Sequence, residues 1–166
     1  VIGVFCFYRF GFEYETILMF VIAMILLAIT MIDFDTMTIP DGLNMTMFLV
    51  CLVLMFVRQM SLVDSIIGMF CISLPMFLLN LVIPDSFGGG DIKLMFASGI
   101  ALGWKYSLLA AFIGILIAGI YCIYLILTKK VDKKGHIAFG PYLSIGIFIA
   151  LCYGYEIISW YLNLLM

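Results

Sequence analysis

The segment YSLLAAFIGILIAGIYCIYLIL, residues Tyr106–Leu127, decides the fold class of this chain. It runs for 22 residues without a charged side chain, and about 20 consecutive apolar residues are enough for an α-helix to cross a bilayer. The rest of the chain is similar, because 66% of the 166 residues are hydrophobic, 11% are charged and the mean hydropathy is +1.29. A water-soluble domain of this size does not need so much apolar surface. The sequence therefore predicts an all-α, polytopic transmembrane helical bundle.

Charged residues, proline and glycine divide the remainder into further apolar runs. Val1–Phe10 is too short to span a bilayer, and we interpret it as the tail of a helix whose beginning lies upstream. The other runs are Thr16–Ile32, Leu43–Val57, Leu62–Ile83, Ile92–Leu102 and Ile137–Tyr155. Ile92–Leu102 reaches only about 16 Å as a helix, so it either extends to Lys105 or forms a short span buried among neighbours. We expect one domain, residues 1–166, with about six spans plus a truncated N-terminal helix.

Alternating spans place the polar connections on two faces of the membrane. The connections 33–41, 84–90 and 128–136 share one face with five of the eight lysines and arginines, and the other face has three. Those five are Lys93, Lys129, Lys130, Lys133 and Lys134. Because basic connections favour the cytoplasmic side, we expect the first face to be cytoplasmic. Four lysines form the only basic cluster in the sequence, which argues against nucleic-acid binding. The sequence contains no C-x-x-C pair, so it gives no sign of a local zinc site.

Two aspartates stand beside apolar runs on that same face. Asp33 follows Thr16–Ile32, and Asp91 follows the glycine triplet Gly88–Gly90. A carboxylate at a bilayer boundary is costly to hold, which marks it as a functional candidate. Two adjacent carboxylates share one proton, so the ionised group can draw a proton from water while the protonated group hydrogen-bonds a carbonyl. The pattern favours peptide hydrolysis, with Asp35 competing against Asp33 for one of the two positions.

Residues around the two aspartates are candidates for contact with a substrate. Glycine lets another backbone approach closely, so we expect Gly88, Gly89 and Gly90 to admit an extended peptide beside Asp91; the alternative is a flexible loop. Lys93 could lower the pKa of an aspartate or bind an acidic group of the substrate. The alternative is a lysine that extends its ammonium group to the membrane interface. Elsewhere, Asp41 is expected to cap the helix that follows Pro40.

Three segments resemble those of the type 4 prepilin peptidases, which are GxGD membrane aspartyl proteases. FGGGDIKL at Phe87–Leu94 contains the G-x-G-D pattern. IDFDTMTIPDGLN at Ile32–Asn44 is similar to the family's other aspartate segment, and FGPYL at Phe139–Leu143 resembles a third. The three segments occur in the family's order and at plausible spacing, and the resemblance extends over nearly the whole chain.

This resemblance implies a catalytic pair, a substrate and a location. Asp33, rather than Asp35, would pair with Asp91 to cleave precursors of type IV pilins or pseudopilins at the cytoplasmic face of a bacterial inner membrane. Acids such as Asp35, Asp41 and Asp85 would steer the basic leader of that substrate. Other GxGD proteases, of the preflagellin or presenilin-like kind, are the alternative enzymes. A proton-coupled transporter is the non-enzyme alternative, because transporters also use intramembrane acids.

The same resemblance bears on cofactors and partners. Proteolysis by a carboxylate pair is expected to need neither a metal nor a cofactor. Many members of the family also carry C-x-x-C zinc ligands and methylate the new N-terminus with S-adenosylmethionine. Neither the cysteine pairs nor a glycine-rich nucleotide fingerprint occurs in this chain, so S-adenosylmethionine is a candidate only if the full-length protein methylates. The expected partners are the pilin-like precursor and the lipid bilayer, and the oligomeric state is left open.

Overall fold

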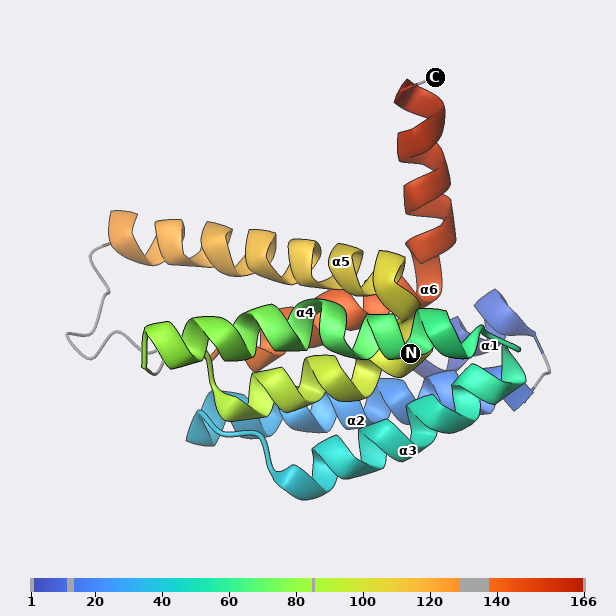
Figure 1. Cartoon of the computed structure of the whole chain (residues 1–166), viewed down its shortest axis with the longest axis horizontal. Coiled ribbons are helices and arrows are strands. Elements are labelled where there is room, and N and C mark those ends of the chain that lie inside the picture. Colours follow the sequence, from blue (N-terminus) through green and yellow to red (C-terminus); the bar gives the residue numbers. More distant parts are fainter. Residues whose placement is uncertain (1, 12–13, 85, 129–137, 166) are drawn as a thin grey trace.

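The computed structural model describes residues 2–11, 14–84, 86–128 and 138–165 (Figure 1). Every regular element within those ranges is an α-helix. In chain order the helices are α1 (Ile2–Phe10), α2 (Tyr14–Thr36), α3 (Asp41–Val57), α4 (Leu62–Val82), α5 (Gly89–Leu127) and α6 (Gly140–Leu165). The predicted all-α helical bundle is confirmed.

Four of the described helices, α2, α4, α5 and α6, are long and apolar enough to cross a membrane. The fifth apolar helix, α3, has 17 residues. At 39 residues α5 is long enough for two spans, and it is interrupted at Gly103. Counting α3 and both halves of α5 gives the six spans expected from the sequence, with α1 as the short N-terminal helix.

The chain reverses direction inside α5, at Gly103. The φ of 66° and ψ of 177° at this residue lie outside the helical region, and a positive φ is accessible to glycine at little steric cost. In Figure 1 the first half of α5 (yellow-green) runs along the bundle and the second half (gold to orange) returns. The first half is therefore the 14 residues Gly89–Leu102, which form a short span rather than a helix reaching Lys105.

Glycines let the helices approach at backbone distance. A Cβ atom on Gly68 of α4 would lie 2.7 Å from the Cα atom of Gly103, and one on Gly99 would lie 2.7 Å from the carbonyl carbon of Gly68. A Cβ atom on Gly146 of α6 would lie 3.0 Å from the backbone nitrogen of Gly114 in α5. Small residues at such contacts are typical of helices that pack within a bilayer. They allow α5 to pack closely against both α4 and α6.

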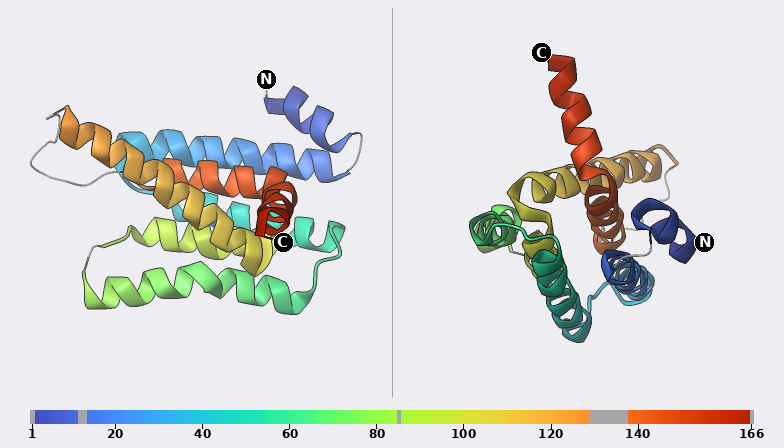
Figure 2. Two further views of the ribbon diagram at one scale, coloured as in Figure 1. Left: turned by 90° about the horizontal axis from the view of Figure 1, so that it is seen from above. Right: turned by 90° about the vertical axis from the view of Figure 1, so that its right-hand side faces the viewer.

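The two ends of the bundle collect different segments. The C-terminal ends of α2 and α4 and the N-terminal ends of α3, α5 and α6 meet at the end drawn on the left of Figure 1. Residues 33–41 and 86–90 lie at this end, whereas Asp85 and the loop 129–137, with its four lysines and His136, fall outside the described residues. The opposite end holds the α3–α4 connection and the reversal at Gly103. There the C-terminal part of α6 turns away from the bundle, as Figure 2 shows.

Candidate functional site

Asp33 lies inside α2, one turn before its end. The helix continues to Thr36, so this aspartate does not follow the helix as the apolar run alone indicated. Its side chain is buried, and the backbone N–H of Gly140, the first residue of α6, donates a hydrogen bond of 3.0 Å to its Oδ2 atom. A Cβ atom on Gly140 would lie 2.7 Å from the same oxygen. Glycine at this position therefore lets the α6 backbone reach the carboxylate.

Asp91 lies in the first turn of α5, with Gly88 as the N-cap residue. Its backbone N–H donates to the Gly88 carbonyl at 3.0 Å. The side chain is buried, and its Oδ1 atom has no hydrogen-bond partner among the described residues. The N-terminus of a helix carries partial positive charge, which favours a carboxylate there. Asp91 is thus held by the start of its own helix.

Ile39 lies between the two aspartate segments. Its Cβ atom would be 2.7 Å from a Cβ on Gly90, and its Cδ1 atom would be 3.2 Å from a Cβ on Gly140. Gly90 directly precedes Asp91, and the backbone N–H of Gly140 binds Asp33. The Ile39 side chain therefore contacts both halves of the site and links the two helix ends that carry Asp33 and Asp91. Carboxylates that meet at such a point favour a pair that carries one proton between them.

The glycine triplet is only partly a loop. Gly88 is extended, whereas Gly89 and Gly90 belong to α5, so the prediction of a loop through residue 90 is wrong for these two. Among the described residues, no atom outside the start of α5 itself lies within 4 Å of a Cβ placed on Gly89, but a Cβ on Gly90 would meet Ile39. The close approach at Gly90 is therefore to this chain's own Ile39. Contact between the triplet and a substrate peptide stays a prediction.

The acids Asp35 and Asp41 beside the two buried aspartates are exposed. Asp35 is exposed on α2, in contrast to the buried Asp33. Asp41 does not cap α3, because Pro40 is the N-cap residue and no side chain bonds the helix start. Instead the Oδ1 atom of Asp41 forms an exposed ion pair of 2.6 Å with Nζ of Lys93. This pair joins the first turns of α3 and α5 beside Gly90.

Asn44 is a buried polar residue of this site to which the sequence analysis gave no role. It lies in α3, and its Nδ2 atom donates to the Gly90 carbonyl at 3.3 Å. A groove of about 270 Å³ between α3 and α5 is lined by Asn44, Asp41 and Lys93 together with apolar side chains. In the sequence, the sign that could have pointed to Asn44 is its position as a polar residue near the start of an apolar run that follows Pro40. Among the described residues, no group of three or more histidine, cysteine, aspartate or glutamate side chains could hold a metal ion.

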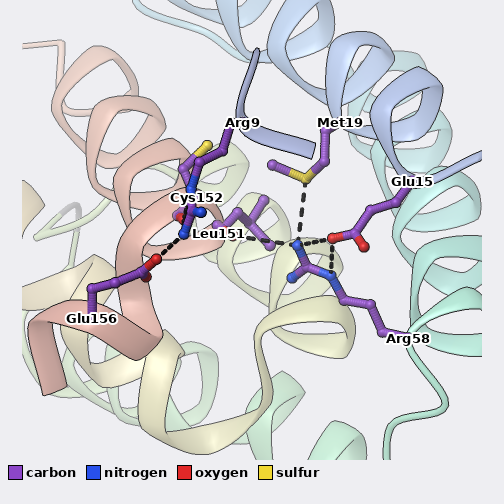
Figure 3. Close-up of polar contacts among 7 residues, drawn as sticks. All are labelled: Arg9, Glu15, Met19, Arg58, Leu151, Cys152 and Glu156. Atoms are coloured by element: carbon purple, nitrogen blue, oxygen red, sulfur yellow. Dashed lines mark hydrogen bonds and ion pairs between the residues drawn. The ribbon is translucent and has the colours of Figure 1, made fainter. Parts of the chain in front are cut away.

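A second polar cluster occupies the opposite end of the bundle (Figure 3). Arg58 donates to Glu15 Oε1 from Nε at 2.8 Å and from Nη2 at 2.5 Å, and to the Leu151 carbonyl at 3.3 Å. Arg9 forms an ion pair with Glu156 and donates to a backbone carbonyl of α6. Arg9, Arg58 and Glu156 line a cleft of about 410 Å³. In this cluster each of the two arginines is paired with a glutamate.

Comparison with known proteins gives matches over most of the chain. A model of the type IV leader peptidase family matches residues 20–123. Prepilin leader peptidase/N-methyltransferases from Aeromonas salmonicida (strain A449), Aeromonas hydrophila and Bacillus subtilis (strain 168) are 33%, 34% and 30% identical over 148, 145 and 160 residues. The alignments cover 86%, 84% and 94% of this chain but 51%, 50% and 63% of the relatives, so the chain spans about half to under two thirds of their length. No solved structure matches the chain.

Proposed function

The chain belongs to the type IV leader peptidase family, and on that premise we propose that it is the membrane part of an aspartyl endopeptidase. Its substrates are type IV prepilin-like precursors, and the bond cleaved joins their short basic leader to the mature chain. The site faces the cytoplasm from a bacterial inner membrane. The relatives' printed names support the substrate class, and the apolar helices support the membrane location.

One observation carries the aspartyl mechanism. Asp33 and Asp91 come from separate helices, are both buried at one end of the bundle, and lack an ion-pair partner among the described residues. Exposed carboxylates would simply ionise in water, whereas buried neighbours favour a single shared proton. Catalytic acid–base work needs that state, in which one group accepts a proton while the other donates a hydrogen bond.

The reaction then proceeds as general acid–base catalysis. The ionised carboxylate takes a proton from a water molecule, whose oxygen attacks the scissile carbonyl, while the protonated carboxylate donates to the carbonyl oxygen. Collapse of the tetrahedral intermediate breaks the C–N bond, and the leaving amine takes up a proton. The Gly140 N–H stabilises negative charge on Asp33, and the start of α5 does so for Asp91. No step needs a metal or an organic cofactor.

The surroundings of the pair fit a substrate that enters from the membrane boundary. Asp35 is exposed at the end of α2 and supplies negative charge toward a basic leader. Asp41 contributes less, because Lys93 neutralises it. The relatives' names include N-methyltransferase, and S-adenosylmethionine enters this proposal only if the full-length protein methylates. The position of both aspartates at one end of the bundle disfavours a transporter, which needs acids along a path between the two faces.

The test is cleavage and topology measured on the same full-length protein. Reconstituted protein should release the leader from a purified prepilin, with the new N-terminus read by sequencing. In intact cells, a cysteine placed at the exposed Thr38 in a cysteine-free variant should resist an impermeant thiol reagent added from outside. The matched control is a cysteine at the exposed Gln59, at the opposite end, which should react. Absence of cleavage, or the reverse labelling pattern, would contradict the proposal.

A further inference from the structure

Asn44 stands apart from the other polar side chains of α3. Its amide is buried, and its hydrogen bond leaves the helix to reach the Gly90 carbonyl of α5 at 3.3 Å. Thr46, two residues later, is exposed and bonds the Gly42 carbonyl of its own helix at 2.8 Å. The Thr46 contact is local, whereas the Asn44 contact joins two helices at the residue that precedes Asp91.

The Asn44 amide is only half used. Its Oδ1 atom is buried without a hydrogen-bond partner among the described residues. A buried, unsatisfied acceptor lowers the free energy of unfolding, and an apolar side chain of similar shape would avoid that loss. Packing alone therefore gives no reason for an amide here. The described contact that distinguishes asparagine from leucine is the donor to Gly90.

That donor completes the support of the Gly90 peptide. The Ile39 side chain contacts the Cα side of Gly90, at a position where a Cβ atom would lie 2.7 Å from it. Asn44 holds the carbonyl of the same residue. Ile39 also contacts Gly140, whose N–H binds Asp33. The two contacts together set the backbone of Asp91 relative to Asp33.

We propose that Asn44 is a positioning residue that fixes the Gly90–Asp91 backbone for catalysis through its hydrogen bond to the Gly90 carbonyl. This role rests on the proposed peptidase function. Misplacement of a catalytic group by about 1 Å costs roughly 100-fold in rate, so loss of the donor should lower kcat and leave KM for the prepilin nearly unchanged. Stability should not fall with kcat, because the unpaired acceptor is removed at the same time.

The experiment compares four variants of the full-length enzyme in vesicles, using a prepilin as substrate and rates per folded protein. Asn44→Leu should lose roughly 100-fold in kcat with Tm equal to or above that of the wild type. Asn44→Ala should lose kcat similarly, and it decides the matter if leucine does not fold. Asn44→Gln, which keeps the donor, should recover part of the rate. Thr46→Val is the matched control and should behave as the wild type.

The outcomes separate this role from a structural one and from failure of the proposed function. Wild-type kcat in folded Asn44→Leu or Asn44→Ala would overturn the positioning role while leaving the peptidase proposal intact. A loss of Tm with unchanged kcat per folded molecule would show that Asn44 serves packing only. If the wild type itself does not cleave prepilin, both proposals fall together.

Discussion

Arg58 and Glu15 form a two-bond ion pair at one end of the bundle, whereas Asp33 and Asp91 at the other end have no described partner of opposite charge. Both pairs lie within the same apolar helical bundle, and in both the ionisable groups are largely shielded from bulk water. The arginine end satisfies its charges with carboxylates and with helix carbonyls. The aspartate end offers one backbone N–H and one helix N-terminus.

This difference teaches what each end contributes. A charged group with a well-placed partner keeps its protonation state, because that partner fixes its proton affinity and its geometry. Two buried carboxylates without an ion-pair partner among the described residues are costly to hold, and where they adjoin they can exchange a proton. We therefore expect changes at the arginine end to alter stability and changes at the aspartate end to alter rate.

The largest expected effect is loss of either buried aspartate. Asp33→Asn and Asp91→Asn should each lower prepilin cleavage by about 10²–10⁴-fold, because either change removes the one-proton state. The initial rate of leader release by full-length enzyme in vesicles measures this. Asp35→Asn is the matched control, since Asp35 is exposed two residues away. An inactive Asp35→Asn with an active Asp33→Asn would mean that the wrong acid has been assigned.

The next effect should distinguish two neighbouring glycines. Gly90→Ala places a Cβ atom 2.7 Å from Ile39, which displaces the segment carrying Asp91. Gly89→Ala meets no other segment of the described chain within 4 Å. We expect Gly90→Ala to lose about 10- to 100-fold in kcat and Gly89→Ala to stay near the wild type. Ile39→Gly combined with Gly90→Ala removes the Ile39 Cβ atom that the new side chain meets, and should recover part of the rate. Equal rates for the two single variants would remove the role of Ile39.

At the arginine end we expect a loss of stability with little change in rate. Breaking a buried ion pair costs roughly 3–5 kcal/mol, and partial exposure of this pair reduces that to about 1–3 kcal/mol; the two side chains are 21% and 22% exposed. Arg58→Met should therefore lower the free energy of unfolding in detergent, with cleavage per folded molecule preserved. A double-mutant cycle with Glu15→Gln isolates the pair. Full stability in Arg58→Met would contradict this interpretation of the cluster.

The smallest mutational effect should come from the exposed ion pair beside the aspartates. The side chains of Lys93 and Asp41 are 56% and 76% exposed, and exposed pairs contribute about 0–1 kcal/mol. Lys93→Met should change the free energy of unfolding by less than about 1 kcal/mol in the same assay. A loss as large as that of Arg58→Met would show that exposure does not separate the two pairs.

Much of the fold could be predicted from composition, but helix ends depended on backbone chemistry. The long apolar runs identified the spans, since only helices and closed barrels satisfy the backbone in a bilayer. Because Asp33 is charged, the apolar pattern predicts that its run ends at Ile32. Nothing in the backbone stops the helix there, however, and it continues to Thr36. Pro40 instead disfavours a helical conformation at Ile39, and it is the N-cap residue of α3.

The candidate site was less predictable wherever a contact joins distant segments. The sequence shows that Gly90 precedes Asp91. It does not show that Ile39, 51 positions earlier, contacts Gly90, because that contact forms only when separate helices pack together. Asp41 had the residue type and position of a cap, but it pairs with Lys93 across the α3–α5 contact. Asn44 gave no local pattern that points to Gly90. The aspartates themselves stood out because charge is rare in this chain.

The reversal at Gly103 also has an elastic consequence for the membrane. It limits the first half of α5 to 14 residues, or about 21 Å, while the 17 residues of α3 reach about 25 Å, against about 30 Å of hydrocarbon. The first half of α5 is largely buried among other helices, so the mismatch falls on α3, whose side chains Met45, Leu49 and Phe56 are exposed. Thinning of the lipid around α3 costs fractions of a kcal/mol per Å. Both helices begin beside Asp91, so acyl-chain length sets how deep that carboxylate lies. Cleavage rates compared in vesicles of different lipid thickness would reveal whether the bilayer tunes this depth.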